Sequence, residues 1–195
     1  MFLEKFYPKK YVRSLYSINL KKYYKMGYRG ILFDIDNTVV PHGAAATDKA
    51  INFFNKLRRI GFKFCLISNN KEERVKSFAT AVDAPYICDA HKPSTKSYID
   101  AMDIMGTDME ETIFVGDQLF TDVFGGNRAN MYTILVRKIN PKEEFQIVLK
   151  RYLEKVVLFF YVRRDRKKLR KEKKQYNKRR LSLLMKKNKK KTTAK

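Results

Sequence analysis

Short apolar runs alternate with helical patterns along the middle of the chain, and this alternation limits the folds open to it. The runs cover residues 31–33, 62–67, 86–88, 112–115 and 132–136. Helical spacing of apolar residues covers 48–60, 71–81, 94–105 and 122–130. Because the runs are almost continuously apolar, we expect each strand to be buried on both faces, as in a parallel sheet. The pattern predicts an α/β fold with a doubly wound parallel sheet and right-handed crossovers.

The helix expected at residues 48–60 has well-marked ends. Thr47 precedes it, and a threonine hydroxyl can accept a hydrogen bond from a free backbone N–H of the first turn. Gly61 follows it, and glycine readily adopts the left-handed conformation that often ends a helix.

The charge of the chain is concentrated at its two ends. The 195 residues have a net charge of +23, from 43 basic and 20 acidic side chains. Residues 31–162 contain 17 side chains of each sign, whereas residues 1–30 have a net charge of +7 and residues 163–195 one of +16. A neutral core with basic flanks bears on the binding partners of the protein rather than on its fold.

These shifts in composition predict four segments. We expect residues 1–29 to form a basic and aromatic segment that packs on the core, and residues 30–144 to form the core itself. Residues 145–162 should form an amphipathic helix, and residues 163–195 a basic tail, for which extended, loosely helical and disordered states are all open. The apolar face of the helix comprises Val148, Leu149, Tyr152, Leu153, Val156 and Phe160.

The aromatic side chains of the N-terminal segment allow two interpretations. They are Tyr7, Tyr11, Tyr16, Tyr23 and Tyr24, and they stand among basic residues. Such rings can stack on nucleic-acid bases. Packing against the sheet is the favoured interpretation, because aromatic side chains dominate the burial of apolar surface in cores.

Cysteine use and hydropathy indicate the compartment. Cys65 and Cys88 lie in or beside apolar runs without the spacing of a zinc site, which is typical of reduced thiols. The N-terminus lacks the apolar segment of a signal peptide, and no stretch has the roughly 20 apolar residues that span a bilayer. We expect a cytoplasmic protein without a transmembrane segment, with peripheral contact at the inner face of the membrane as an open alternative.

Two acids follow the first apolar run, and they are the first candidates for chemistry. Asp34 and Asp36 are two residues apart, so they would share a face if the strand continued. Such a pair can bind a hard cation, and one acid can attack a substrate while the other moves a proton. The alternative is a turn rich in Asp and Asn that simply ends the strand.

Three further polar segments are expected near strand ends. Ser68 and Asn69 follow the second run, Lys92 lies in the loop after the third, and Asp117 and Asp122 follow the fourth. The carboxyl ends of parallel strands meet in one crevice, so we expect these side chains to converge there. A nucleophile, a Mg²⁺ site and fixed positive charge are what phosphoryl transfer requires.

These segments resemble the four signature motifs of the haloacid dehalogenase (HAD) superfamily of Mg²⁺-dependent phosphatases. They are more similar to its YqeG-type branch, a subclass III group related to the phosphatidylglycerophosphate phosphatases. The resemblance covers residues 11–139 and leaves out the basic tail. It rests on Asp34-Ile35-Asp36-Asn37-Thr38, Ser68-Asn69-Asn70 with Arg74-Val75, Lys92-Pro93, and Gly116-Asp117-Gln118 through Gly125-Gly126-Asn127-Arg128-Ala129-Asn130-Met131. Val39-Val40-Pro41-His42 departs from the Leu-Val and Trp common in the family, at the entrance of the expected site.

The resemblance implies a HAD-like Rossmannoid fold and roles for the acids. Asp34 would be the nucleophile that forms an aspartyl-phosphate, and Asp36 would protonate the leaving oxygen and then activate water. Asp34, Asp117 and the backbone carbonyl of Asp36 would hold Mg²⁺, which accepts few protein ligands. Asp122 would support the water shell of the metal or Lys92.

The resemblance also implies the groups that bind the phosphoryl group. Ser68 would donate a hydrogen bond to it, with a backbone amide near Asn69 assisting, and Lys92 would neutralise the charge on Asp34 and phosphate. Thr38 would position Asp34 by hydrogen bonding. His42 and His91 lie near the expected site, and either could touch substrate or be polar surface.

The segments between the motifs are too short for a large inserted cap domain. An open site favours a bulky, polymeric or membrane-bound phosphate. By family resemblance the favoured substrate class is phosphatidylglycerophosphate. A phosphatase of nucleic-acid ends is an alternative, and a ribosome- or RNA-associated binding protein with the same fold is another.

The sequence leaves open which partner the basic tail binds. Each basic residue near an anionic membrane contributes about 1 kcal/mol, and the apolar stretches 156–162 or 181–185 could insert into it. Contacts with the phosphates of RNA are the second alternative. A solvated tail with no partner is the third.

Overall fold

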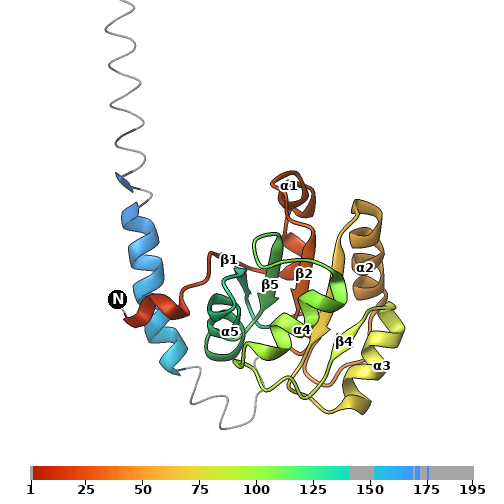
Figure 1. The fold of residues 1–195 in the computed structure, drawn as a ribbon. Coiled ribbons are helices and arrows are strands. Elements are labelled where there is room, and N and C mark those ends of the chain that lie inside the picture. The colour runs from red at the N-terminus through yellow and green to blue at the C-terminus, as the bar shows by residue number, and fades with distance from the viewer. Residues whose placement is uncertain (1, 141–151, 169, 172–174, 176–195) are drawn as a thin grey trace, which may run out of the picture. The chain divides into compact units, whose positions relative to one another are not determined.

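The computed structural model describes residues 2–140, 152–168, 170, 171 and 175 (Figure 1). The chain divides into two compact units, residues 1–154 and 155–195. The first unit is built on a six-stranded sheet with the order β1-β6-β5-β2-β3-β4, in which every pair of neighbours is parallel. The expected α/β fold with a doubly wound parallel sheet is confirmed.

The observed strands and helices follow the expected ones closely between residues 30 and 136. The strands are β1 (Lys10–Val12), β2 (Gly30–Phe33), β3 (Lys63–Ile67), β4 (Tyr86–Ile87), β5 (Thr112–Gly116) and β6 (Tyr132–Val136). The helices are α1 (Leu20–Lys25), α2 (Asp48–Ile60), α3 (Glu72–Val82), α4 (Lys96–Met105) and α5 (Phe124–Arg128). Helix α2 has the expected bounds because both of its caps form: Thr47 accepts from Ala50 N, and Gly61 is left-handed with φ 99°.

The expected bounds of one helix were wrong. In place of a single helix over 122–130, the wide π turn η3 (Leu119–Val123) begins earlier and leads into α5. The N-terminal segment contains η1 (Phe2–Phe6), β1, η2 (Leu15–Ser17) and α1. Strand β1 pairs with the edge of β6, from Lys10 beside Ile134 to Val12 beside Val136. Its three residues are mostly exposed and too few to show a strand period in the sequence.

Each central strand is buried on both faces, and its side chains point alternately into two apolar layers, one on each side of the sheet. Ile31 and Phe33 of β2 belong to the layer that contains α2 and α3, whereas Leu32 belongs to the layer that contains α4 and α5. The same alternation places Phe64 in the first layer and Cys65 in the second. The period of two residues explains why runs without polar positions are required here.

The N-terminal aromatic side chains mostly pack on the core. Tyr7 and Tyr23 are buried, and the ring of Tyr16 meets that of Phe53 at 5.5 Å between centroids. The Tyr16 hydroxyl also donates a hydrogen bond to Val39 O at 3.0 Å. Tyr11 is exposed. These contacts tie the N-terminal segment to the loop that follows β2.

Both cysteines are free thiols. Cys65 is fully buried, and this burial raises the pKa of its thiol to about 12, so the group is protonated at neutral pH. Cys88 is half-buried.

Residues 152–168 form a helix near the C-terminus. The first part of the expected helix, residues 145–151, lies outside the described residues, and the observed helix continues past the expected boundary at residue 162. The apolar stretch 181–185 also lies outside them. The helices within the described part of the chain are too short or too polar to span a lipid bilayer.

We expect Thr47→Ala to lower the free energy of unfolding by about 1 kcal/mol, because it removes the hydroxyl that accepts from Ala50 N at 3.2 Å. Thr47→Ser keeps a hydroxyl at this position and should retain most of the stability. Urea unfolding followed by circular dichroism measures both changes. Equal stability of the alanine and serine variants would contradict the capping role.

Candidate active site

The motif residues meet at the carboxyl edge of the sheet, around the point where the strand order reverses. Strand β2 lies between β3 and β5, so the chain leaves β2 where the two halves of the sheet diverge. Asp34 directly follows β2, Ser68 follows β3, and Asp117 follows β5. Lys92 arrives from the loop after β4. Such a switch point is where open α/β sheets bind ligands.

A buried ion group holds the centre of this edge together. The Lys92 ammonium donates to Asp34 Oδ1 at 2.6 Å and to Asp122 Oδ1 at 2.8 Å. The side chains are 3%, 9% and 1% exposed, in the order Lys92, Asp34, Asp122. Charged groups as buried as these are tolerated only when they are paired and hydrogen-bonded.

The pKa values of this group reflect opposing effects. Burial, assisted by the negative charge of Asp122, raises the pKa of Asp34 to about 6 although Lys92 opposes the shift. Burial alone would lower the pKa of Lys92, but Asp122 and Asp34 outweigh it and keep that pKa above its usual value. Lys92 is therefore a cation at neutral pH, and the pKa of Asp34 lies close to neutral pH.

The same edge collects more negative charge than Lys92 balances. Carboxylate oxygens of Asp34, Asp117 and Asp122 all lie within 4.8 Å of one another, and all three residues are buried. Asp34 Oδ2 is buried and has no hydrogen-bond partner among the described residues. An unpaired carboxylate oxygen beside two further acids fits a hard divalent cation, which prefers oxygen ligands.

Two local features bring Asp122 into place. The wide turn η3 lets Asp122 Oδ2 accept from the backbone N–H groups of Asp117 and Gln118, at 3.1 and 3.0 Å. Gly116 is required at the end of β5, because a Cβ there would come within 2.5 Å of the Asp122 side chain. The motif therefore folds back on itself and presents Asp122 to Lys92.

The side chain of Asn69 contacts the backbone of Lys92. Its Oδ1 accepts from Lys92 N at 2.7 Å, and its Nδ2 donates to Lys92 O at 3.4 Å. The Asn69 side chain thus fixes the loop that carries the lysine. The substrate contact expected from Asn69, through a nearby backbone amide, stays a prediction.

Asp36 lies apart from the cluster of Asp34, Asp117 and Asp122. Its Oδ1 accepts from Gly43 N at 2.7 Å and from Arg74 Nη2 at 3.0 Å, and its Oδ2 accepts from Asn70 Nδ2 at 2.6 Å. Asn70 and Arg74 belong to the second motif, but their residue types alone could not show which acid they contact.

Thr38 is buried, and its hydroxyl lies 3.5 Å from Asp117 Oδ1. This contact joins the loop after β2 to the loop after β5. Asn37 next to it is left-handed with φ 62°, which asparagine tolerates better than most residues. The loop therefore turns sharply after Asp36.

A cavity of about 220 Å³ opens over these groups. Ser68 lies in its wall with its Oγ accepting from Asn70 N at 3.2 Å, so the hydroxyl proton can be donated to a ligand. His42 also lines the cavity, whereas His91 is not among the described lining residues. The lining comprises Asp34, Asp36, Asn37, His42, Ser68, Asn69, Asn70, Lys92, Gln118 and Thr121. Gln118 and Thr121 were not expected there, since neither residue type indicates a site by itself.

The parallel sheet and the motifs at its carboxyl edge define a HAD-type phosphatase. A HAD-hydrolase-like family model matches residues 90–143. The chain is 35% identical over 158 residues to the probable phosphatase YqeG of Bacillus subtilis, which covers 80% of this chain and 92% of that protein. The chain therefore belongs to the YqeG family of HAD-like phosphatases, as the motifs predicted.

Other similar proteins are also phosphatases. The chain is 33% identical over 96 residues to the glyceraldehyde 3-phosphate phosphatase of Methanopyrus kandleri, a match over 49% of this chain and 36% of that protein. A solved structure, the D,D-heptose 1.7-bisphosphate phosphatase from B. bronchiseptica complexed with magnesium and phosphate, is 17% identical. The match covers 56% of this chain and 81% of that chain, with a TM-score of 0.48.

We expect Lys92→Met to lower the free energy of unfolding by about 3–5 kcal/mol in the presence of EDTA, because Asp34 and Asp122 would lose their buried counter-charge. Lys71→Met is the matched control, since Lys71 pairs with Asp89 at 3.2 Å but is 87% exposed. Water screens that pair, so the control should unfold almost like the wild type. Similar losses in urea unfolding for both variants would contradict the importance of the buried pair.

Proposed function

We propose that the protein is a Mg²⁺-dependent phosphomonoester hydrolase that works through an aspartyl-phosphate on Asp34. The observation that carries this proposal is the buried Lys92, which contacts Asp34 beside an acidic cluster with an unpaired oxygen. Asp34 and Asp117 would hold the ion, with the backbone carbonyl of Asp36 as the ligand implied by family resemblance. When bound, Mg²⁺ supplies positive charge that stabilises the transferring phosphoryl group.

In the first step, an Asp34 carboxylate oxygen attacks phosphorus. A bond forms between that oxygen and phosphorus, and the bond from phosphorus to the leaving oxygen breaks. Asp36 gives its proton to the leaving oxygen, so the product departs as a neutral alcohol. Lys92 balances the charge around Asp34, and Ser68 donates a hydrogen bond to a phosphoryl oxygen.

In the second step, water cleaves the aspartyl-phosphate. Asp36, now ionised, takes a proton from the water while the water oxygen bonds to phosphorus. The bond from phosphorus to Asp34 breaks, inorganic phosphate leaves, and Asp36 is again protonated for the next cycle. One carboxyl group thus acts as acid and then as base.

Asp34→Asn should abolish phosphate release from 4-nitrophenyl phosphate and should prevent capture of a phosphoenzyme. Release of phosphate by Asp34→Asn at the wild-type rate would exclude the aspartyl-phosphate.

Asp117→Asn should weaken Mg²⁺ binding at least about tenfold, because it removes a charged oxygen ligand. Calorimetric titration of Mg²⁺ measures that change, and Asp108→Asn, outside the site, should bind the ion like the wild type.

For the substrate, we propose a phospholipid-borne phosphomonoester, with phosphatidylglycerophosphate as the class that family resemblance favours. The segments that lead from β2 to α2 and from β3 to α3 are short, so neither of them, within the described residues, contains a large inserted cap. The cavity is small and polar and suits a phosphate group rather than a whole lipid. A nucleic-acid end presents a similar phosphate and remains the alternative substrate.

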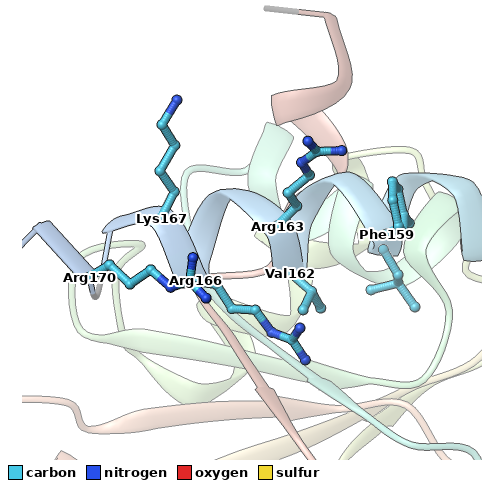
Figure 2. Close-up of a pocket in the computed structure, with 7 residues that line it drawn as sticks. Phe159, Val162, Arg163, Arg166, Lys167 and Arg170 are labelled. Atoms are coloured by element: carbon cyan, nitrogen blue, oxygen red, sulfur yellow. The ribbon is translucent and has the colours of Figure 1, made fainter.

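The helix of residues 152–168 supports a partner with an anionic surface. Val156, Phe159 and Phe160 are exposed, at 54%, 59% and 43%. Figure 2 shows basic side chains that extend from the same helix and its continuation beside Phe159 and Val162. The basic side chains are those of Arg163, Arg166, Lys167 and Arg170. They line a pocket of about 830 Å³ together with Leu158, Phe159 and Val162.

Exposed apolar and basic side chains on one helix favour an anionic membrane surface over RNA. Residues 156, 160, 163, 167 and 170 recur at spacings of three and four, so they follow one helical face. Its first part is apolar and its second part basic. Apolar side chains can enter the headgroup region while the basic ones meet lipid phosphates.

We expect the full chain to bind vesicles that contain phosphatidylglycerol and to lose about a hundredfold in affinity when Arg163, Lys167 and Arg170 are replaced by alanine, since each contributes about 1 kcal/mol. Vesicle sedimentation measures this. In the control variant, alanine replaces Lys56, Lys76 and Lys96, three exposed lysines of the first unit. This variant should bind the vesicles almost as well as the wild type. Equal losses in both triple variants would contradict the role of the helix, and retention on RNA without vesicle binding would favour the nucleic-acid alternative.

A further inference from the structure

We propose that Arg74 is a positioning residue that holds Asp36 in place for proton transfer. This inference rests on the proposed function, because it assigns to Asp36 the role of acid and base. It goes beyond that function by naming the residue through which the orientation of Asp36 is set. Arg74 itself does not line the cavity of the site among the described residues.

Three donors from three different segments surround the Asp36 carboxylate. Gly43 N reaches Oδ1 from the loop after β2, Asn70 Nδ2 reaches Oδ2 from the loop after β3, and Arg74 Nη2 reaches Oδ1 from helix α3. Each oxygen therefore has at least one donor. Rotation of the carboxyl group would break contacts with two or three of these segments.

Arg74 is the member of this set that joins the segments to one another. Its Nη2 also donates to Ala44 O at 2.8 Å, so the same nitrogen binds Asp36 and the loop that carries Gly43. The guanidinium lies 5.7 Å from the centroid of the Phe78 ring, one turn further along α3. Arg74 is thus fixed by its own helix while it restrains a loop that has no regular structure.

The charge and shape of Arg74 suit this role. The Arg74 side chain is 22% exposed and that of Asp36 is 11% exposed, so little water competes for the contact. A guanidinium stays protonated throughout a catalytic cycle, and it directs several N–H groups in one plane. His42 also faces Asp36, but its Nδ1 is 3.9 Å from Oδ1 and its side chain is 56% exposed. That distance is too long for a hydrogen bond.

Loss of Arg74 should therefore impair the proton transfer by Asp36 and no other step of the reaction. Without Arg74, Asn70 and Gly43 still contact Asp36, but the loop is no longer tied to α3 and the carboxyl group can turn. Nucleophilic attack by Asp34 does not depend on that contact. The loss should therefore be larger for a leaving oxygen that needs a proton than for one that departs readily as an anion.

The test compares two esters under saturating Mg²⁺: benzyl phosphate, a poor leaving group, and 4-nitrophenyl phosphate, a good one. Asp36→Asn should lower kcat/KM for benzyl phosphate by about a hundredfold or more relative to 4-nitrophenyl phosphate, the scale of general acid catalysis. Arg74→Gln should shift the same ratio in the same direction by about tenfold. Arg74→Lys keeps the charge but not the planar donors, and it should recover only part of that loss.

Two controls separate positioning from a general structural effect. Arg58→Gln removes an arginine of α2 that donates to Val82 O, away from the site, and it should leave the ratio unchanged. The double variant Arg74→Gln with Asp36→Asn should have the same ratio as Asp36→Asn alone, because both changes remove the same proton transfer. A merely structural role of Arg74 would lower activity on both esters equally and would add to the effect of Asp36→Asn.

Each outcome decides a different claim. If Asp36→Asn shifts the ratio and both Arg74 variants leave it unchanged, the inference about Arg74 is wrong while the proposed function stands. If Asp36→Asn does not shift it, or the wild type hydrolyses neither ester, the proposed function and the inference fall together. Should Arg74→Gln fail to fold, the ratio of Arg74→Lys decides, with a wild-type value overturning the inference.

Discussion

The structure depends on the contact of one buried lysine with two aspartates. Lys92 reaches Asp34 after β2 and Asp122 in η3, so it joins both sides of the point where the strand order reverses. Charges buried to this degree cost several kcal/mol unless they are paired, so the ion group strongly stabilises the folded arrangement of these loops. The same contact shapes the environment of Asp34, the proposed nucleophile, because Lys92 is a cation at neutral pH and the pKa of Asp34 is raised.

The two acids of the first motif have separate surroundings although they are two residues apart. Asp34 faces a lysine and other carboxylates, whereas Asp36 faces a glycine amide, an asparagine and an arginine. Strand β2 ends at Phe33, so both acids lie beyond it and are not held on the common face that a continued strand would have given them. Different surroundings for two carboxyl groups allow them to take different roles in one reaction.

The core and the C-terminal helix serve different requirements. The sheet must be apolar on both faces, so its functional groups are restricted to the loops at one edge. The helix of residues 152–168 carries exposed apolar side chains and leads into basic ones, which a protein core does not need. Hydrolysis and attachment to a surface are therefore assigned to separate parts of the chain in our proposals.

The sequence by itself determined the fold class, the central strands, helix α2 with both caps, and the family, because buried strands, caps and catalytic motifs each require particular residue types at fixed spacing. Strand β1 was not predictable, since three mostly exposed residues become a strand only when β6 offers an edge to pair with. Likewise, Ser68, Lys92 and Asp117 could be named from motifs, but the partners of Asp36 could not. Arg74 is 38 positions from Asp36 in the chain, and only the packing of α3 beside the loop after β2 brings them together.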